Sequence, residues 1–249
     1  MTIKPFISNR KFKVVETILK SVIKASDPAL AIRRHLSVTG DYLKVNDTIY
    51  KLSEYRNVYV VGGGKASAPM AATLEEKLGG RITAGIINVK YGHTLPPMLP
   101  KGGPDVSYGP TSKIEIIEAG HPIPDRSGLT GAKKMSRLLD WAVEDDLVIA
   151  LLSGGASALI PLPVKGITLR DKKRVAELLL KSGATIDDIN IVRKHISAIK
   201  GGQMASMAYP ARVISLILSD VIGDPIDIIA SGPTVSDKSS FEDAKEILV

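Results

Sequence analysis

Cysteine is absent from the 249-residue sequence, and aromatic residues make up only 4% of it. The lack of cysteine excludes disulfides, thiolate zinc sites and a cysteine nucleophile. Because the chain is 44% hydrophobic but poor in aromatics, its core must be filled by aliphatic side chains. Only four histidines occur, and none stands at the paired spacing of metal ligands, which argues against a zinc site.

Long apolar runs are also lacking. No stretch reaches the ~18 residues of a membrane span, and the amino terminus lacks the ~7–15-residue apolar run of a signal peptide. The net charge of +7 comes from dispersed lysines and arginines without interleaved aromatics, so small anionic ligands explain it better than nucleic acid. We therefore expect a cytoplasmic protein with small-molecule partners and no nucleic-acid or membrane partner, and leave a homo-oligomer open.

Short apolar strands alternate with helical patterns along the chain. Strands are expected at 58–61, 82–89, 114–118, 146–152 and 212–218. Helices are expected at 11–24, 28–36, 66–78, 127–141, 169–181, 186–198, 202–208 and 241–248. This alternation predicts an α/β fold with a Rossmann-like parallel sheet flanked by helices on both faces, residues 1–249 forming mostly one domain. The proline- and glycine-rich stretch 93–110 reads as a loop.

Four of the expected strands end in polar segments that contain glycine. These segments are 62–65, 119–125, 153–157 and 219–224. Ligands of parallel sheets bind beyond the carboxyl ends of the strands, so the four segments are expected to form one site. Each of them taken singly could instead be an ordinary turn.

The first segment is Gly62-Gly63-Gly64-Lys65. Glycines let the backbone approach an anion closely, and Lys65 could neutralise a phosphoryl group or hold a carboxylate. The segment matches neither a P-loop nor the dinucleotide fingerprint, since Ala66 and Ser67 stand where those motifs require Ser or Thr and glycine. It is either an anion site or a tight structural turn, and we assign Lys65 as a catalytic residue and the three glycines as phosphate ligands.

The segment after the next apolar strand contains Ser153, Gly154, Gly155 and Ser157. Two hydroxyls and bare backbone amides suit the oxygens of a phosphate or carboxylate, so we predict a second phosphate-binding or nucleotide-binding cradle here. A serine-hydrolase elbow would need glycine at position 159, where leucine stands.

Asp220 and Asp224 follow the last expected strand. Phosphoryl transfer needs Mg²⁺, which prefers a few carboxylate oxygens together with water and substrate phosphate. We predict that both residues bind the metal and that Asp220 is also catalytic. The alternative is that either carboxylate caps a short helix.

Two further segments could bind an acidic substrate. Arg193 and Lys200 lie at i and i+7 on one expected helix, so they would share a face with Ser197. His121 and Asp125 lie in a loop that prolines make stiff. These four charged or titratable residues are our candidate substrate ligands, although the helix face could simply be solvated and the loop a rigid corner.

In this order, the motifs of the chain resemble those of the glycerate 2-kinase family, whose members end in the so-called MOFRL domain and are sometimes labelled hydroxypyruvate reductase. They span about residues 12–237 and are Gly62–Ser67, Ala119–Asp125, Leu152–Leu159, Asn190–His195, Lys200–Gly202, Leu218–Asp224 and Ile229–Thr234. The resemblance implies ATP-dependent phosphorylation of D-glycerate to 2-phosphoglycerate, with ATP and Mg²⁺ as cofactors. It also implies a Rossmann-like domain, a smaller second domain, and Lys65 as the active-site lysine in the cleft between them.

The family also relies on a carboxyl-terminal half with a catalytic arginine. This sequence stops at Val249, so we expect that half to be missing from the chain and to be needed for activity. Two alternatives stay open. One is an NAD(P)H-dependent hydroxypyruvate reductase, and the other is a non-catalytic ligand-binding half that another chain completes.

Overall fold

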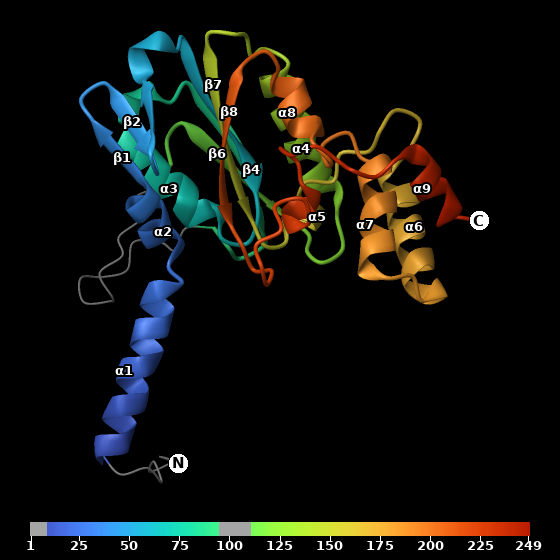
Figure 1. Ribbon diagram of the computed structural model, residues 1–249, viewed down its shortest axis with the longest axis horizontal. Coiled ribbons are helices and arrows are strands. Elements are labelled where there is room, and N and C mark those ends of the chain that lie inside the picture. The colour runs from blue at the N-terminus through green and yellow to red at the C-terminus, as the bar shows by residue number, and fades with distance from the viewer. Residues whose placement is uncertain (1–8, 95–110) are drawn as a thin grey trace.

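The computed structural model describes residues 9–94 and 111–249, and its centre is a five-stranded parallel sheet with the order β6-β5-β4-β7-β8 (Figure 1). The strands are β4 (Asn57–Gly63), β5 (Ala84–Lys90), β6 (Ile114–Ala119), β7 (Asp146–Ser153) and β8 (Arg212–Leu218). Numbered along the chain, this order is 3-2-1-4-5, which is the Rossmann arrangement, so the predicted fold class is confirmed. Most of the loop expected at 93–110 lies outside the described residues.

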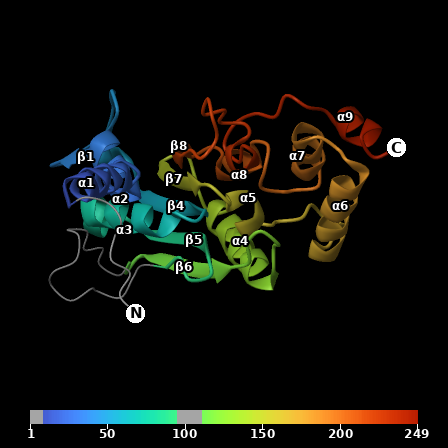
Figure 2. The same cartoon turned by 90° about the horizontal axis from the view of Figure 1, so that it is seen from below.

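Helices cover both faces of the sheet (Figure 2). On one face lie α2 (Pro28–His35) and α3 (Ser67–Leu78), and on the other lie α4 (Arg126–Leu139) and α8 (Gln203–Ala208). Each face has its own core of mainly Ile, Val, Leu, Ala and Met side chains, as the scarcity of aromatics requires. The strand β7 lies inside the sheet, between β4 and β8, and is buried along its whole length, which explains its largely apolar sequence.

A three-stranded antiparallel sheet was not predicted. Its strands β1 (Leu36–Thr39), β2 (Tyr42–Val45) and β3 (Thr48–Lys51) are four residues each and form two hairpins. Strands this short show little alternation, and most of their side chains are exposed, so the sequence offered only a weak pattern. Leu36 and Leu43 attach the small sheet to the core that α2 and α3 share.

Three helices lie beyond α4 and α8, away from the central sheet (Figure 2). They are α6 (Leu169–Ser182), α7 (Ile186–His195) and α9 (Phe241–Glu246). A small cluster of Leu179, Ile189 and Val192 holds α6 and α7 together, with Ile247 packed against it. Each of the three helices begins with a capping box, at Thr168, Thr185 and Ser240. That residues 1–249 form mostly one domain stays a prediction.

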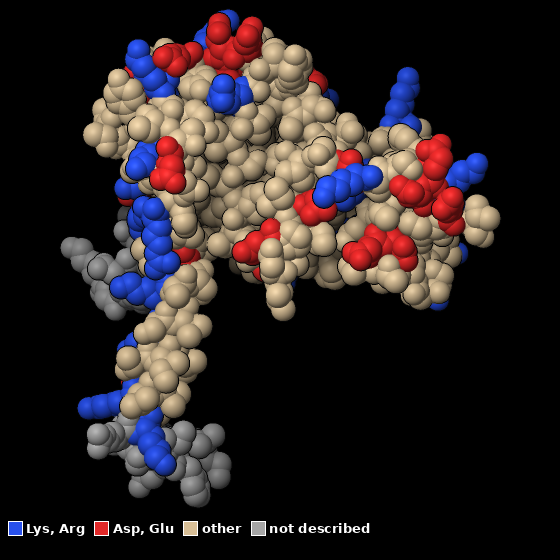
Figure 3. Space-filling view, viewed as in Figure 1, with Lys and Arg blue, Asp and Glu red and all other residues tan. Residues whose placement is uncertain are grey.

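The helix α1 (Asn9–Ala25) extends away from the rest of the molecule (Figure 1). Its apolar residues are exposed (Figure 3). They are Phe12, Val14, Val15, Ile18, Leu19, Val22 and Ile23. No helix within the described residues is long and apolar enough to cross a membrane.

Candidate active site

The carboxyl ends of four parallel strands meet over Gly154 and Gly155. A Cβ atom added to Gly154 would lie 2.0 Å from Oδ2 of Asp220, which follows β8. A Cβ atom added to Gly155 would lie 3.0 Å from both the ring of His121, which follows β6, and Cε of Lys65, which follows β4. The structure therefore brings five of the predicted residues together, and the two glycines are required because the side chains of Asp220, His121 and Lys65 occupy the space above them.

The Gly62–Gly64 segment is buried and packed directly against its neighbouring strands. Gly62 and Gly64 have φ angles of +140° and +143°, and a Cβ atom on them would lie 2.0 Å from Leu151 O and Ser153 Oγ, respectively. The N–H of Gly64 donates to Asn88 O, and the N–H of Lys65 donates to Gly154 O. These donors are engaged within the protein, so tight packing explains the glycines, and their role as phosphate ligands stays a prediction.

Ser153 has a structural task at the same place. Its buried hydroxyl accepts the N–H of Ala66 at 3.1 Å and lies 3.3 Å from the hydroxyl of Ser67. It thereby ties the end of β7 to the start of α3, across a sequence separation of 87 residues. A phosphate-binding role for Ser153 stays a prediction.

The available amides lie in the segment 154–157. In the part of the chain that the structure describes, the N–H groups of these four residues have no hydrogen-bond acceptor. Gly154 and Gly155 are half-exposed, and Gly155 has a left-handed φ of +87°. Ala156 is buried, so the accessible unpaired N–H groups beside Lys65 are those of Gly154 and Gly155, and such neighbouring N–H groups suit an anion.

His121 lies beside Lys65 and has the properties of a neutral base. Its partial burial lowers its pKa, and the positive charges of Lys65 and Lys90 lower it further, while Asp220 acts in the opposite direction. The ring is therefore largely neutral at pH 7, with a nitrogen able to accept a proton.

Asp125 is tied to the backbone of its own loop. Its carboxylate caps α4 by accepting the N–H of Gly128 at 2.8 Å, and it also accepts the hydroxyl of Tyr91 at 2.8 Å. Both contacts stabilise the His121 loop, and a substrate-binding role for Asp125 stays a prediction.

Asp220 and Asp224 differ in their surroundings. The Asp220 carboxylate lies against Gly154, next to the free amides. Asp224 is exposed in a turn with φ of +50°, and no contact among the described residues links it to Asp220. No group of three or more His, Asp or Glu side chains in those residues could hold a metal by itself. Asp220 fits a Mg²⁺ ion that takes its remaining ligands from water and phosphates.

Arg193 and Lys200 meet, though not on one helix as predicted. The helix α7 ends at His195, and Lys200 lies in the turn after it, because the chain bends to form a bridge between Ser197 and Pro163. Arg193 Nη2 lies 2.7 Å from Ser157 Oγ, and Lys200 Nζ lies 2.6 Å from the same atom. Ser157 thus joins both predicted substrate ligands to the free amides.

The structure adds two residues to this group that sequence reasoning missed. Ser231 Oγ lies 3.0 Å from Ser157 Oγ, and Ser231 and Ala230 both have left-handed φ angles, of +62° and +56°. Such strain in residues other than glycine often marks a functional site. Lys172 is buried on α6 and donates to Ile196 O at 3.2 Å. Lys172 precedes the buried Leu179 by seven residues, which places both on the same face of the helix, and this spacing could have identified Lys172 from the sequence.

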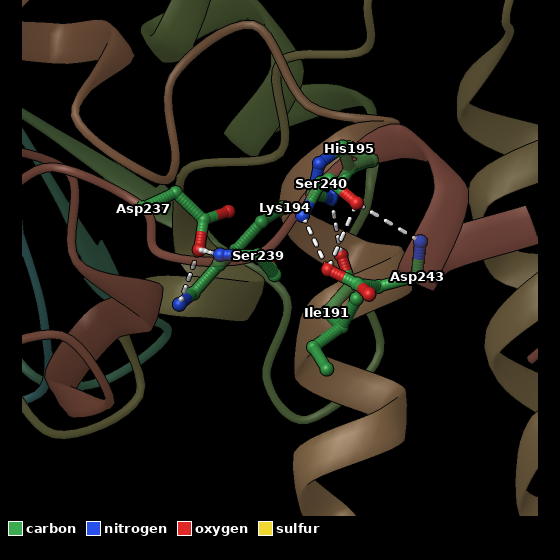
Figure 4. A network of polar contacts seen from close by, with 7 residues as sticks. All are labelled: Ile191, Lys194, His195, Asp237, Ser239, Ser240 and Asp243. Carbon is green, nitrogen blue, oxygen red and sulfur yellow. Dashed lines mark hydrogen bonds and ion pairs between the residues drawn. The ribbon is translucent and has the colours of Figure 1, made fainter.

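A cavity of about 1160 Å³ lies next to Lys200, on the side of α7, α8 and the segment 234–242. One wall is the network in Figure 4, in which Lys194 forms an ion pair with Asp237 at 3.2 Å and Ser240 forms a capping box with Asp243. Lys65 and Asp220 do not line this cavity; their side chains are exposed on an open face. We base the candidate site on that open face, because the strand ends and the free amides converge there.

Comparisons with known proteins identify the family of the chain. Residues 14–249 match the family model described as "Domain of unknown function (DUF4147)". The chain is 44% identical over 232 residues to a glycerate 2-kinase from Pyrococcus horikoshii, covering 93% of this chain and 48% of that protein. It is 42% identical over 234 residues to a glycerate kinase from Rattus norvegicus, covering 93% of this chain and 44% of the relative.

Solved structures give the same result. A crystal structure of a Pyrococcus horikoshii protein aligns with a TM-score of 0.83 and 41% identity, over 98% of this chain and 51% of that one. A crystal structure of glycerate kinase from Thermotoga maritima aligns with a TM-score of 0.78 and 38% identity, over 95% and 50%. The chain therefore spans about half the length of the curated relatives it matches. It belongs to the DUF4147 family and is a domain of the glycerate kinase type, as its motifs implied.

Proposed function

We propose that the chain provides the nucleotide-binding and phosphoryl-transfer face of an enzyme that phosphorylates D-glycerate at its 2-hydroxyl with ATP. The observation that carries this proposal is the surface where the free amides of Gly154 and Gly155 lie between the Lys65 side chain and the Asp220 carboxylate. Phosphoryl transfer depends on positioning and charge stabilisation, and these three elements supply both.

Each residue has a defined role in this proposal. The amides of Gly154 and Gly155 and the ammonium of Lys65 hold the oxygens of the transferred phosphate. Asp220 orients Mg²⁺, which when bound would offset the negative charge of the nucleotide phosphates. Neutral His121 is placed beside Lys65 to accept the proton of the attacking hydroxyl.

The site is open, and this supports a role for further residues in completing it. Lys65 and Asp220 are exposed, and the glycerate kinase relatives are about twice as long as this chain. We therefore propose that full activity needs a second part, comparable to the other half of those relatives, that covers this face.

The test measures binding and turnover separately. Calorimetry with ADP and Mg²⁺ should show binding to the chain, and Lys65→Met should weaken it at least ~10-fold, without lowering the melting temperature, because an exposed lysine adds little stability. Lys24→Met on the distant α1 is the matched control. Turnover is followed by ³¹P NMR, which separates 2-phosphoglycerate from 3-phosphoglycerate. Unchanged ADP affinity and turnover in Lys65→Met would refute the role of Lys65.

A hydroxypyruvate reductase is the second candidate. A relative from Agrobacterium vitis that is 45% identical over 189 residues carries the name "putative hydroxypyruvate reductase". The loop after β4 argues against a reductase, since the N–H groups of Gly64 and Lys65 donate hydrogen bonds within the protein and are not free to bind a dinucleotide pyrophosphate. NADH oxidation by the chain with hydroxypyruvate would favour this candidate.

A further inference from the structure

Three cationic side chains, two of them buried and one half-exposed, lie close to one another near Ser157. Lys200 is 2% exposed and donates to both the carbonyl and the hydroxyl oxygen of Ser157, at 2.7 and 2.6 Å. Arg193 donates to the same hydroxyl, and Lys172, 8% exposed, donates to Ile196 O. Every one of these acceptors is a neutral oxygen.

The cluster of Lys172, Arg193 and Lys200 has no counter-charge. No ion pair within the described residues involves any of the three. Lys194, the next residue on α7, provides a direct comparison, because it is similarly enclosed but paired with Asp237 at 3.2 Å. Buried cations normally have an anionic partner, since neutral acceptors do not repay the loss of hydration.

The electrostatics of the cluster follow from this imbalance. Burial, together with the positive charge of Arg193, lowers the pKa of Lys172 from 10.5 to about 7. Burial, and then the charges of Arg193 and Lys172, hold the pKa of Lys200 well below its usual value. An anion placed here would restore the missing charge, and the lysines would take up protons as it bound.

The cluster adjoins the proposed phosphoryl-transfer face. Ser157 lies two residues after Gly155, against which Lys65 and His121 pack. Arg193 and Ser157 are half-exposed, whereas Lys172 and Lys200 are buried, so an anion would meet Arg193 first. A guanidinium presents paired donors that match the two oxygens of a carboxylate.

We propose that Arg193, Lys200 and Lys172 form the carboxylate-binding subsite for the acceptor substrate. This inference rests on the proposed function and extends it, since it names the part of the substrate that this wall recognises. The subsite selects small 2-hydroxy acids over neutral polyols, because a neutral ligand leaves the three cations unbalanced. Binding is accompanied by proton uptake.

The experiment is calorimetry of D-glycerate binding to the chain at pH 8, in two buffers of different ionisation enthalpy, with glycerol as the neutral ligand. D-glycerate should bind with a net uptake of protons, and glycerol should not bind. Arg193→Lys should weaken D-glycerate binding at least ~10-fold by removing the paired donors, with ADP affinity unchanged. Lys172→Met should reduce the proton uptake and weaken binding. Lys194→Met is the matched control and should leave binding unchanged.

Stability separates a binding role from a structural one. Replacing an unbalanced buried cation with methionine should raise the melting temperature of Lys172→Met while D-glycerate binding falls, a combination that misfolding cannot produce. Two results would overturn the subsite. One is an equal D-glycerate affinity in wild type, Arg193→Lys and Lys172→Met. The other is a chain that binds ADP but does not bind D-glycerate. Cation-dependent D-glycerate binding without any ADP binding would instead support the subsite and refute the kinase proposal. If inorganic phosphate or ADP competes with D-glycerate for the cluster, the anion it holds is a phosphate, and the carboxylate assignment is wrong.

Discussion

The stability of the protein should rise between pH 7 and pH 9, and Lys172 should cause a defined part of the rise. Burial lowers the pKa of Lys172 from 10.5 to about 7 in the folded protein. In this pH range the unfolded chain keeps the proton on Lys172 while the folded chain loses it. The unfolded state therefore binds more protons, and the free energy of unfolding increases with pH by up to about 1.4 kcal/mol per unit.

The size of the effect can be worked out for this one side chain. At pH 7 about half of the folded molecules carry the proton on Lys172, and at pH 9 almost none do. Integrated over the two units, the contribution of Lys172 is about 2 kcal/mol. Below pH 7 both states are protonated and the full cost of the buried charge remains, about 4–5 kcal/mol relative to an unperturbed lysine.

Urea denaturation at pH 7, 8 and 9 measures this contribution as a difference between variants. Lys172→Met should be more stable than wild type at pH 7, and its stability should rise with pH by about 2 kcal/mol less than that of wild type. Lys173→Met, at the half-exposed neighbouring position, is the matched control and should keep the wild-type pH dependence. Equal pH dependence in wild type and Lys172→Met would refute the reasoning.

Three further outcomes are expected. Gly64→Ala should destabilise the fold by about 3 kcal/mol or more, because its Cβ would lie 2.0 Å from Ser153 Oγ and its φ is +143°. Gly80→Ala is the control, and it should change the melting temperature little because no atom lies within 4 Å of the added Cβ. Thr168→Ala should cost about 1 kcal/mol in urea denaturation by removing the cap of α6, and an unchanged midpoint would contradict the capping role. Because burial lowers the pKa of His121, the rate of glycerate phosphorylation should persist as the pH falls to 6.5 and decline only below that pH. A decline in rate that begins above pH 7 would exclude His121 as the base.

The elements were largely predictable because their signals are local. The continuous apolar run at 147–152 predicted β7, which is buried on both sides. Asp27-Pro28 predicted the start of α2, where the Asp27 carboxylate accepts the N–H of Ala29. The helix expected at 186–198 was too long, because the chain bends after His195 to pair Ser197 with Pro163. No local pattern carries that contact.

The sequence alone determined the alternation of strands and helices, and with it the edge of the sheet at which Lys65, His121, Gly154 and Asp220 follow their strands. Only the tertiary structure decided which groups at that edge are free. Hydrogen bonds such as that from Ala66 N–H to Ser153 Oγ join residues 87 positions apart, and they engage the first glycine loop while leaving the amides of 154–157 unpaired. The same packing buried Lys172 and Lys200 beside Arg193 without an acid. Periodicity reports which face of an element is apolar, but the balance of charge in a buried cluster depends on residues that separate elements contribute.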